Sequence, residues 1–120
     1  MTDADKTQKF CRLFVYGSLK RGCANHEQLG SAQFVSEART TKAFALSLVD
    51  GYPALIPGTR SIQGELFQIA VSELPGLDEF EGEGYAREEV ELDGGGWAIA
   101  YLARAPSAGT PYPLDEWSER

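Results

Sequence analysis

A glutamate near the end of a predicted helix is the side chain best placed to do chemistry. In the stretch SELPGLDEFEGEGY, Leu74, Leu77 and Glu81 are spaced i, i+3 and i+7, which places them on one helix face. The two leucines should face the core, so Glu81 is carried toward the interior. The helix dipole, the nearby Glu79 and Glu83, and desolvation all disfavour a charged carboxylate there and predict a raised pKa. Such a group can transfer protons at neutral pH; the alternative is a solvated acid at a frayed helix end.

A turn that follows the first apolar run is the second candidate. Tyr16, Gly17, Ser18 and Leu19 come directly after the strand-like run CRLFV. A glycine there lets the backbone turn sharply, and consecutive N–H groups in such a turn can bind a carboxylate or a developing oxyanion. The alternative is an ordinary strand-to-loop turn. A nucleophilic role for Ser18 is disfavoured, because His26 is the only imidazole and no GxSxG motif surrounds the serine.

The remaining reactive side chains give weaker signals. Lys20 and Arg21 could attract an acidic substrate or simply lie in a solvated loop. Two cysteines, Cys11 and Cys23, and one histidine, His26, cannot form the usual structural zinc site without carboxylate ligands. The cysteines have no activating neighbour and no CxxC spacing, so we expect reduced thiols in a cytoplasmic protein.

The elements that must position these groups are mostly strands. Strands are predicted at 11–16, within 32–49 as one bent strand or two, and at 61–69, 85–92 and 97–103. The main helix should begin after Ser72 as N-cap, with Pro75 in its first turn, and should stop at Gly82. Turns are predicted at DGYPAL, at PG (57–58) and at the glycine loop 93–96, a short helical turn after Asn25, and a loop-rich tail after 105. This order indicates an α+β fold, with a strongly curved sheet or small barrel packed on the helix.

Length and charge narrow the classes of function. The chain has 120 residues, and 42% hydrophobic and 24% charged residues are ordinary for one globular domain, which we place at 11–117 after a polar tail at 1–10. The polar start predicts no signal peptide, and no apolar run is long enough to cross a membrane. A net charge of −7 disfavours nucleic acid as a partner. Nine of the 18 acids lie within 73–93, so an interaction protein with a basic partner is one alternative function.

Several short segments together resemble the gamma-glutamylcyclotransferase-like family, which includes gamma-glutamylamine cyclotransferase and many small bacterial proteins. The segments are FVYGSLKRG (14–22) followed by Asn25-His26, GYPAL (51–55), GELFQI (64–69), LDEFEGEGYAR (77–87) and WAIAY (97–101). They span about residues 11–103, and the stretch 115–117 resembles a tryptophan-bearing ending of bacterial members.

The resemblance implies a small closed mixed sheet with helices outside, and conversion of a γ-glutamyl amide into 5-oxoproline and a free amine. Glu81 matches the family's glutamate and would act as general base and general acid, without metal or organic cofactor. The backbone from Tyr16 to Leu19, including Gly17 and Ser18, would hold the γ-glutamyl part. Tyr85 would wall the pocket or donate a hydrogen bond, unless it only begins a core strand. The alternative is a non-catalytic module of the same fold that binds a small acidic metabolite; the sequence specifies neither the amine nor the oligomeric state.

Overall fold

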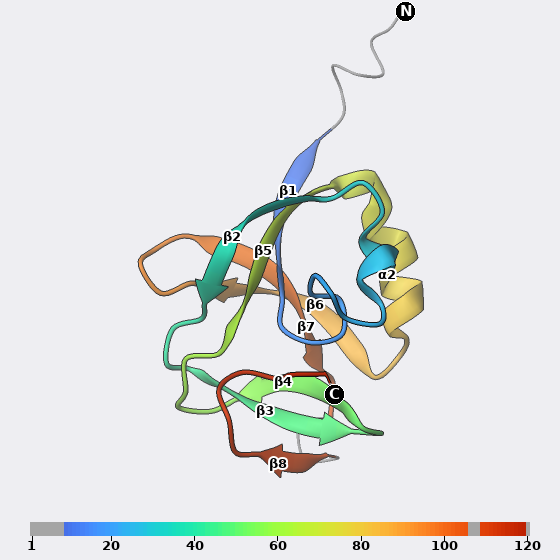
Figure 1. Cartoon of the computed structure of the whole chain (residues 1–120). Helices are drawn as coiled ribbons and strands as arrows, with labels where there is room; N and C mark the ends of the chain where they lie inside the picture. The colour runs from blue at the N-terminus through green and yellow to red at the C-terminus, as the bar shows by residue number, and fades with distance from the viewer. Residues whose placement is uncertain (1–8, 106–108, 120) are drawn as a thin grey trace, which may run out of the picture.

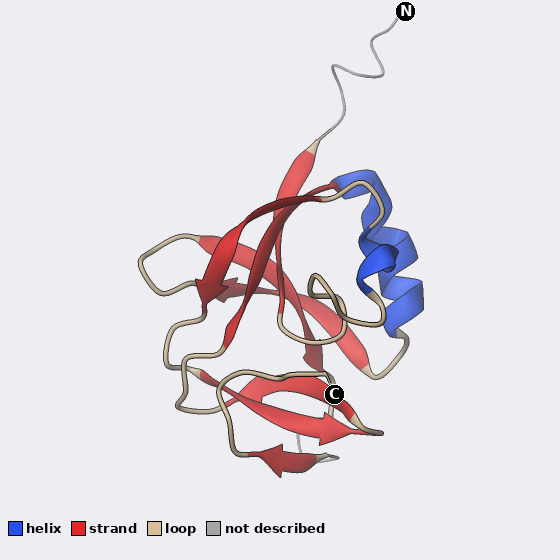
Figure 2. Ribbon diagram, viewed as in Figure 1, coloured by secondary structure: helices blue, strands red, loops and turns tan. Residues whose placement is uncertain are grey.

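The structure is a computed structural model that describes residues 9–105 and 109–119. Its strands are β1 (Phe10–Val15), β2 (Gln33–Arg39), β3 (Phe44–Val49), β4 (Tyr52–Pro57), β5 (Gln63–Ala70), β6 (Tyr85–Glu91), β7 (Trp97–Ala103) and β8 (Thr110–Tyr112). Its helices are the 3-10 helices η1 (His26–Leu29) and η2 (Val71–Glu73) and the α-helix α2 (Leu74–Glu81). The helices gather on one side of the strands, while β3, β4 and β8 lie together at one end (Figures 1 and 2). Residues 1–8 of the predicted tail lie outside the described residues.

The strands form one mixed sheet that curls upon itself. Its order is β2-β5-β1-β7-β4-β3-β8, with β6 paired to β7, and the β1–β7 and β4–β7 pairs are parallel. A bridge between Thr40 and Leu92 joins the end of β2 to the end of β6, and the Asp93 N–H donates to the Arg39 carbonyl at 2.8 Å. The β2, β5, β1, β7 and β6 strands therefore form a closed ring. The α+β fold with a small closed mixed sheet, one main helix and short helices outside is confirmed.

Alternation along β1 divides the core into two layers. Leu13 and Val15 point to the helix side, where they join Leu74 and Leu77 of α2. Phe14 points to the inside of the curled sheet, in the larger core cluster. The buried run of β1 is thus apolar on both faces because the strand lies between the two cores.

The helix α2 follows the predicted face but begins differently. Leu74 and Leu77 are buried, Pro75 lies in the first turn, and the helix ends at Gly82, whose φ of 82° suits a residue without a Cβ. The predicted N-cap at Ser72 is wrong: Ser72 lies inside η2, Glu73 occupies the N-cap position, and no side chain caps the helix. A 3-10 turn precedes α2 directly, so Ser72 lacks the extended backbone of a cap. None of the described helices is long and apolar enough to cross a membrane.

Two segments predicted as irregular are strands. The stretch DGYPAL contains a turn only at Asp50 and Gly51, whose φ values of 53° and 83° make a tight hairpin between β3 and β4. The prediction took Pro53 as a sign of a turn, but a proline near the start of a strand costs little hydrogen bonding, and here Pro53 is the second residue of β4. Within the predicted loop-rich tail, β8 pairs antiparallel with β3. The segment from 32 to 49 forms two strands rather than one bent strand.

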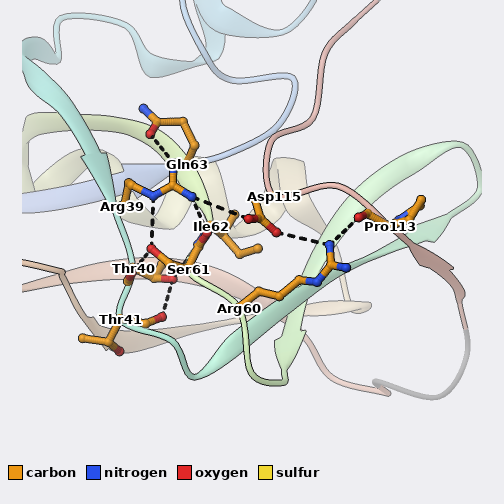
Figure 3. A network of polar contacts seen from close by, with 9 residues as sticks. All are labelled: Arg39, Thr40, Thr41, Arg60, Ser61, Ile62, Gln63, Pro113 and Asp115. Carbon is orange, nitrogen blue, oxygen red and sulfur yellow. Dashed lines mark hydrogen bonds and ion pairs between the residues drawn. The ribbon is translucent and has the colours of Figure 1, made fainter.

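Polar contacts fasten the segment after β8 to the rest of the fold. Figure 3 shows Asp115 between two guanidinium groups, with its carboxylate 3.7 Å from Arg39 Nη2 and 3.2 Å from Arg60 Nη1. The Gln63 N–H donates to the Asp115 carbonyl at 2.8 Å, and Trp117 is buried in the core inside the sheet. The segment is therefore a packed part of the domain.

Candidate active site

One cavity of about 570 Å³ brings together the two sequence candidates. Its walls come from the end of β1 and the turn 16–19, the β3–β4 hairpin, the end of α2, the start of β6 and the second half of β7. Glu81, Tyr16, Gly17, Ser18, Leu19 and Tyr85, the site residues expected from the sequence, all line it. Elements far apart in the chain meet here because β1 and β7 are parallel neighbours at the centre of the sheet.

Glu81 sits at the last turn of α2 with its side chain partly buried in the cavity wall. Burial raises the pKa of its carboxyl group from the usual 4.5 to about 7. Desolvation accounts for this shift, and the nearby Glu79 and Glu83, which are exposed, do not contribute to it. The side chain is therefore half protonated near neutral pH, as a group that both takes and returns a proton requires.

The turn from 17 to 19 lines the same cavity. The Lys20 N–H donates to the Gly17 carbonyl at 3.1 Å and the Asn25 N–H donates to the Ser18 carbonyl at 3.0 Å, which hold the turn in shape. Among the described residues, no protein acceptor is found for the N–H groups of Gly17, Ser18 and Leu19. Such a set of unpaired donors can bind an anion or a developing oxyanion.

The Ser18 hydroxyl has an amide, not a base, as its partner. Asn25 Nδ2 donates to Ser18 Oγ at 2.9 Å, and Asn25, which occupies the N-cap position of η1, makes no side-chain cap bond to that helix. His26 Nδ1 lies 2.9 Å from the Leu19 carbonyl oxygen and is not paired with the serine. The arrangement does not activate Ser18 as a nucleophile.

Four tyrosines are found among the described residues that line the cavity, and two of them, Tyr16 and Tyr85, were expected from the sequence. The buried Tyr16 hydroxyl donates to the Tyr101 carbonyl at 2.5 Å and accepts from the Leu55 N–H at 3.0 Å, so it ties β1 to β7 and β4. The Tyr85 hydroxyl lies 3.4 Å from the Pro53 carbonyl, and burial together with the Glu81 charge raises its pKa. Tyr16 thus contributes a wall held in place, while Tyr85 retains a weakly engaged hydroxyl at the cavity surface.

Sequence reasoning missed Tyr101, which also lines the cavity. Its hydroxyl donates to Asp78 Oδ1 at 2.7 Å, and that same oxygen lies 2.7 Å from Arg87 Nε. Burial and the bond to Asp78 raise the pKa of Tyr101. These two contacts of Asp78, which lies one helical turn before Glu81, link α2 to β6 and β7. The only signal of Tyr101 in the sequence was the aromatic residue that closes the run WAIAY.

The basic side chains near the turn are engaged elsewhere. Lys20 is buried and its Nζ donates to the Trp117 carbonyl at 2.7 Å, while Arg21 pairs with Glu65 and lies 3.5 Å above the Phe34 ring centre. Neither lines the cavity, so neither is placed to attract an acidic substrate into it. In the part of the chain that the structure describes, no cluster of three or more potential metal-ligating side chains is present.

Gly17→Ala should impair the site more than the fold. A Cβ at this position would lie 2.7 Å from Pro53 Cγ, so the turn and β4 must move apart. Because a misplacement of about 1 Å can cost roughly a hundredfold in rate, we expect kcat/KM to fall about tenfold or more. Steady-state kinetics beside a urea unfolding curve checks this; a variant with unchanged kcat/KM would show that the turn does not position substrate.

The match to a family model decides the relationship. The model for gamma-glutamyl cyclotransferase, AIG2-like proteins matches residues 13–119. The chain belongs to this family. It is a gamma-glutamylcyclotransferase-like enzyme, and its curled mixed sheet with one main helix is the family's fold.

Individual relatives agree with the family. The chain is 33% identical over 92 residues to a putative gamma-glutamylcyclotransferase of Vibrio cholerae, which covers 74% of this chain and 80% of that protein. It is 34% identical to gamma-glutamylaminecyclotransferase A of Danio rerio over 67% of this chain and 57% of that longer protein. Among solved structures, an AIG2-like protein of Mus musculus superposes with a TM-score of 0.77 at 25% identity, covering 91% of this chain and 88% of that one.

Proposed function

We propose that this enzyme converts a γ-glutamyl amide into 5-oxoproline and a free amine, with Glu81 as general base and then general acid. The observation that carries the proposal is the shared cavity, which is lined both by Glu81 and by residues 17–19, whose N–H groups have no acceptor among the described residues. The enzymatic activity of the family and the names of the relatives support this reaction class.

The substrate supplies its own nucleophile, so the enzyme needs none. The α-ammonium gives a proton to Glu81, and the resulting amine attacks the γ-carbonyl carbon to close a five-membered ring. The tetrahedral intermediate then collapses: its carbon–nitrogen bond to the leaving amine breaks as Glu81 returns the proton to that nitrogen. The ring nitrogen gives its remaining extra proton to the released amine, which departs as an ammonium and leaves the neutral lactam. The open cavity must hold the bent conformer for ring closure, which is an orientation effect worth several kcal/mol.

Backbone donors have a defined task in this scheme. The γ-glutamyl part carries an α-carboxylate and develops an oxyanion, and no Lys or Arg is found among the described residues that line the cavity. The N–H groups of Gly17, Ser18 and Leu19, which have no acceptor among the described residues, can serve these negative charges. We assign them to binding the γ-glutamyl part, with Tyr16 and Tyr85 as walls.

The dependence of kcat/KM on pH should report the carboxyl group of Glu81. Because burial raises its pKa to about 7, the base form is scarce at pH 5 and dominant at pH 8. We expect kcat/KM to rise with pH about tenfold per unit below pH ~6 and to level off above the pKa. Initial rates over pH 5–9 check this. A midpoint near the ordinary glutamate value would contradict the assignment.

A screen for 5-oxoproline formation tests the proposal directly. The protein is incubated with γ-glutamyl amino acids, the γ-glutamyl-lysine crosslink, glutathione and γ-glutamyl alkylamines, and 5-oxoproline and the released amine are quantified together. Equal amounts of both products from at least one compound, absent with Glu81→Gln, are expected. If no compound yields 5-oxoproline, the fold serves to bind a small acidic metabolite without turnover.

The described cysteines, Cys11 and Cys23, are free thiols, which is consistent with the cytoplasmic location that we propose.

A further inference from the structure

The proposed reaction leaves one carboxylate of the cavity without a task. Asp50 lines the same cavity as Glu81 but belongs to the hairpin turn between β3 and β4. Its left-handed backbone, with φ of 53°, is fixed by the following Gly51 and by the pairing of Val49 with Tyr52. Asp50 is exposed on the wall of the cavity, and its negative charge, after burial and the charge of Glu81, raises the pKa of the Tyr85 hydroxyl. The fold thus holds this acid in a defined place.

Two exposed aromatic rings accompany Asp50 on the cavity wall. Tyr52 at the start of β4 is 50% exposed and Phe80 on α2 is 39% exposed, although large aromatic side chains are normally buried. They come from separate elements, and both line the cavity. Aromatic faces attract ammonium and guanidinium groups, and the attraction adds to that of a nearby carboxylate.

The charges of the wall have one sign. Among the described residues that line the cavity, Asp50 and Glu81 are the charged ones, and both are acidic. Lys20 and Arg21, the nearest bases in the sequence, are held by Trp117 and Glu65. A substrate with a negative group on its amine side would find no counter-charge here, whereas a positive group would.

We propose that the leaving amine of the substrate carries a second, positively charged group, and that it is bound by Asp50 on the cavity wall that also carries Tyr52 and Phe80. This inference rests on the proposed cyclotransferase function, in which Glu81 already pairs with the α-ammonium of the γ-glutamyl part. The second cation therefore requires a second carboxylate, and Asp50 supplies it. The substrate class is a γ-glutamyl amide of a diamine or of another amine with a further ammonium or guanidinium group. Asp50 is a specificity-determining residue in this scheme.

Three amides that differ only at the far end of the amine test the inference. The γ-glutamyl amides of putrescine, n-pentylamine and 5-aminopentanoate end in an ammonium, a methyl group and a carboxylate on chains of similar length. For the unmodified protein we expect kcat/KM to decrease in that order, with at least about a fivefold preference for the ammonium over the methyl group. The preference should shrink as the salt concentration rises.

The variant Asp50→Asn removes the charge and keeps the shape of the turn, because asparagine also tolerates the left-handed backbone. We expect the ratio of kcat/KM for the ammonium and methyl compounds to fall to near one. Asp93→Asn is the matched control: it removes one charge in the turn after β6, about eight residues along the chain from Tyr85 and outside the cavity lining, and should leave the ratio unchanged.

The outcomes separate the inference from the function on which it rests. Equal kcat/KM for all three amides, or a preference for the carboxylate, would overturn the role of Asp50 while 5-oxoproline formation stands. An equal loss with all three amides in Asp50→Asn would also overturn it, because the residue would then act on the γ-glutamyl part. No 5-oxoproline from these amides or from the wider screen would overturn the cyclotransferase function itself.

Discussion

Glu81→Gln is expected to abolish turnover while it leaves the fold intact. Glutamine fills the same space in the cavity wall but can neither take the proton of the α-ammonium nor return one to the leaving amine. Because a single general acid–base contribution is worth roughly a hundred- to ten-thousandfold, we expect kcat to fall about a thousandfold or more. Coupled measurement of 5-oxoproline and amine release checks this, and circular dichroism establishes that the variant is folded.

The same variant, Glu81→Gln, should be more stable than the parent protein at alkaline pH. The pKa of Glu81 is raised from 4.5 to about 7 in the folded protein, so the carboxyl group stabilises the fold only while it is protonated. That contribution is fully present below pH 4.5 and is lost as the pH rises through 7. At pH 8 the variant should exceed the parent by about 1–3 kcal/mol in free energy of unfolding, and at pH 4 the two should agree.

A neighbouring glutamate provides the control for both measurements. Glu83 lies two residues further along, is exposed and does not line the cavity, so Glu83→Gln should change neither turnover nor the pH dependence of stability. If Glu81→Gln kept most of its kcat, or if Glu83→Gln lost as much, the proton transfers would have to be assigned to another group.

Gly64→Ala is expected to have the largest effect on stability. Gly64 is buried in β5, and a Cβ there would collide with the Val15 carbonyl oxygen and lie 2.7 Å from Phe14 Cζ. The Val15 backbone belongs to the central strand and cannot yield without breaking its pairing with β5. We expect a loss of about 3 kcal/mol or more, and a fall in Tm of roughly 10 °C. Urea and thermal unfolding curves measure it.

Gly76→Ala is the matched substitution without a clash. Gly76 lies within α2 and is exposed, and no atom lies within 4 Å of a Cβ built there. Alanine favours helix by about 0.5–1 kcal/mol over glycine, so this variant should be slightly more stable than the parent. A comparable loss in both variants would mean that the close approach of β5 to β1 does not limit the residue at 64.

Local periodicity in the sequence was enough to predict the main helix and its acid. The spacing of Leu74, Leu77 and Glu81 depends only on helix geometry, and the structure buries both leucines and turns the glutamate into a cavity. The hairpin of β6 and β7 could be predicted equally well, because a glycine loop separates two β-forming runs. Predictions of this kind need no knowledge of what the element packs against.

Features set by long-range pairing could not be predicted. Tyr101 reaches the cavity because β7 runs parallel to β1, and no local pattern announces a parallel neighbour. Asp50 was not predicted as a site residue, because the whole stretch through Pro53 was interpreted as a turn. In the structure the turn is short, because the residues from Tyr52 onward form β4, which pairs with both β3 and β7. The cap at Ser72 failed because a 3-10 turn, which depends on tertiary packing, precedes the helix.

The loop that follows the turn at 17–19 is held in place by residues near the C-terminal end of the chain, which are synthesised much later. Lys20 binds the Trp117 carbonyl across 97 positions, and the Ala24 N–H donates to Glu119 Oε1 at 2.7 Å across 95. Contacts of such sequence separation form late, because closing a long loop costs entropy before any contact repays it. During synthesis, the local hydrogen bonds of the turn at 17–19 can form as soon as residue 25 is made, whereas the contacts that fasten Lys20 and Ala24 must wait for residues 117 and 119. The position of this loop on the domain is therefore completed only with the last part of the chain.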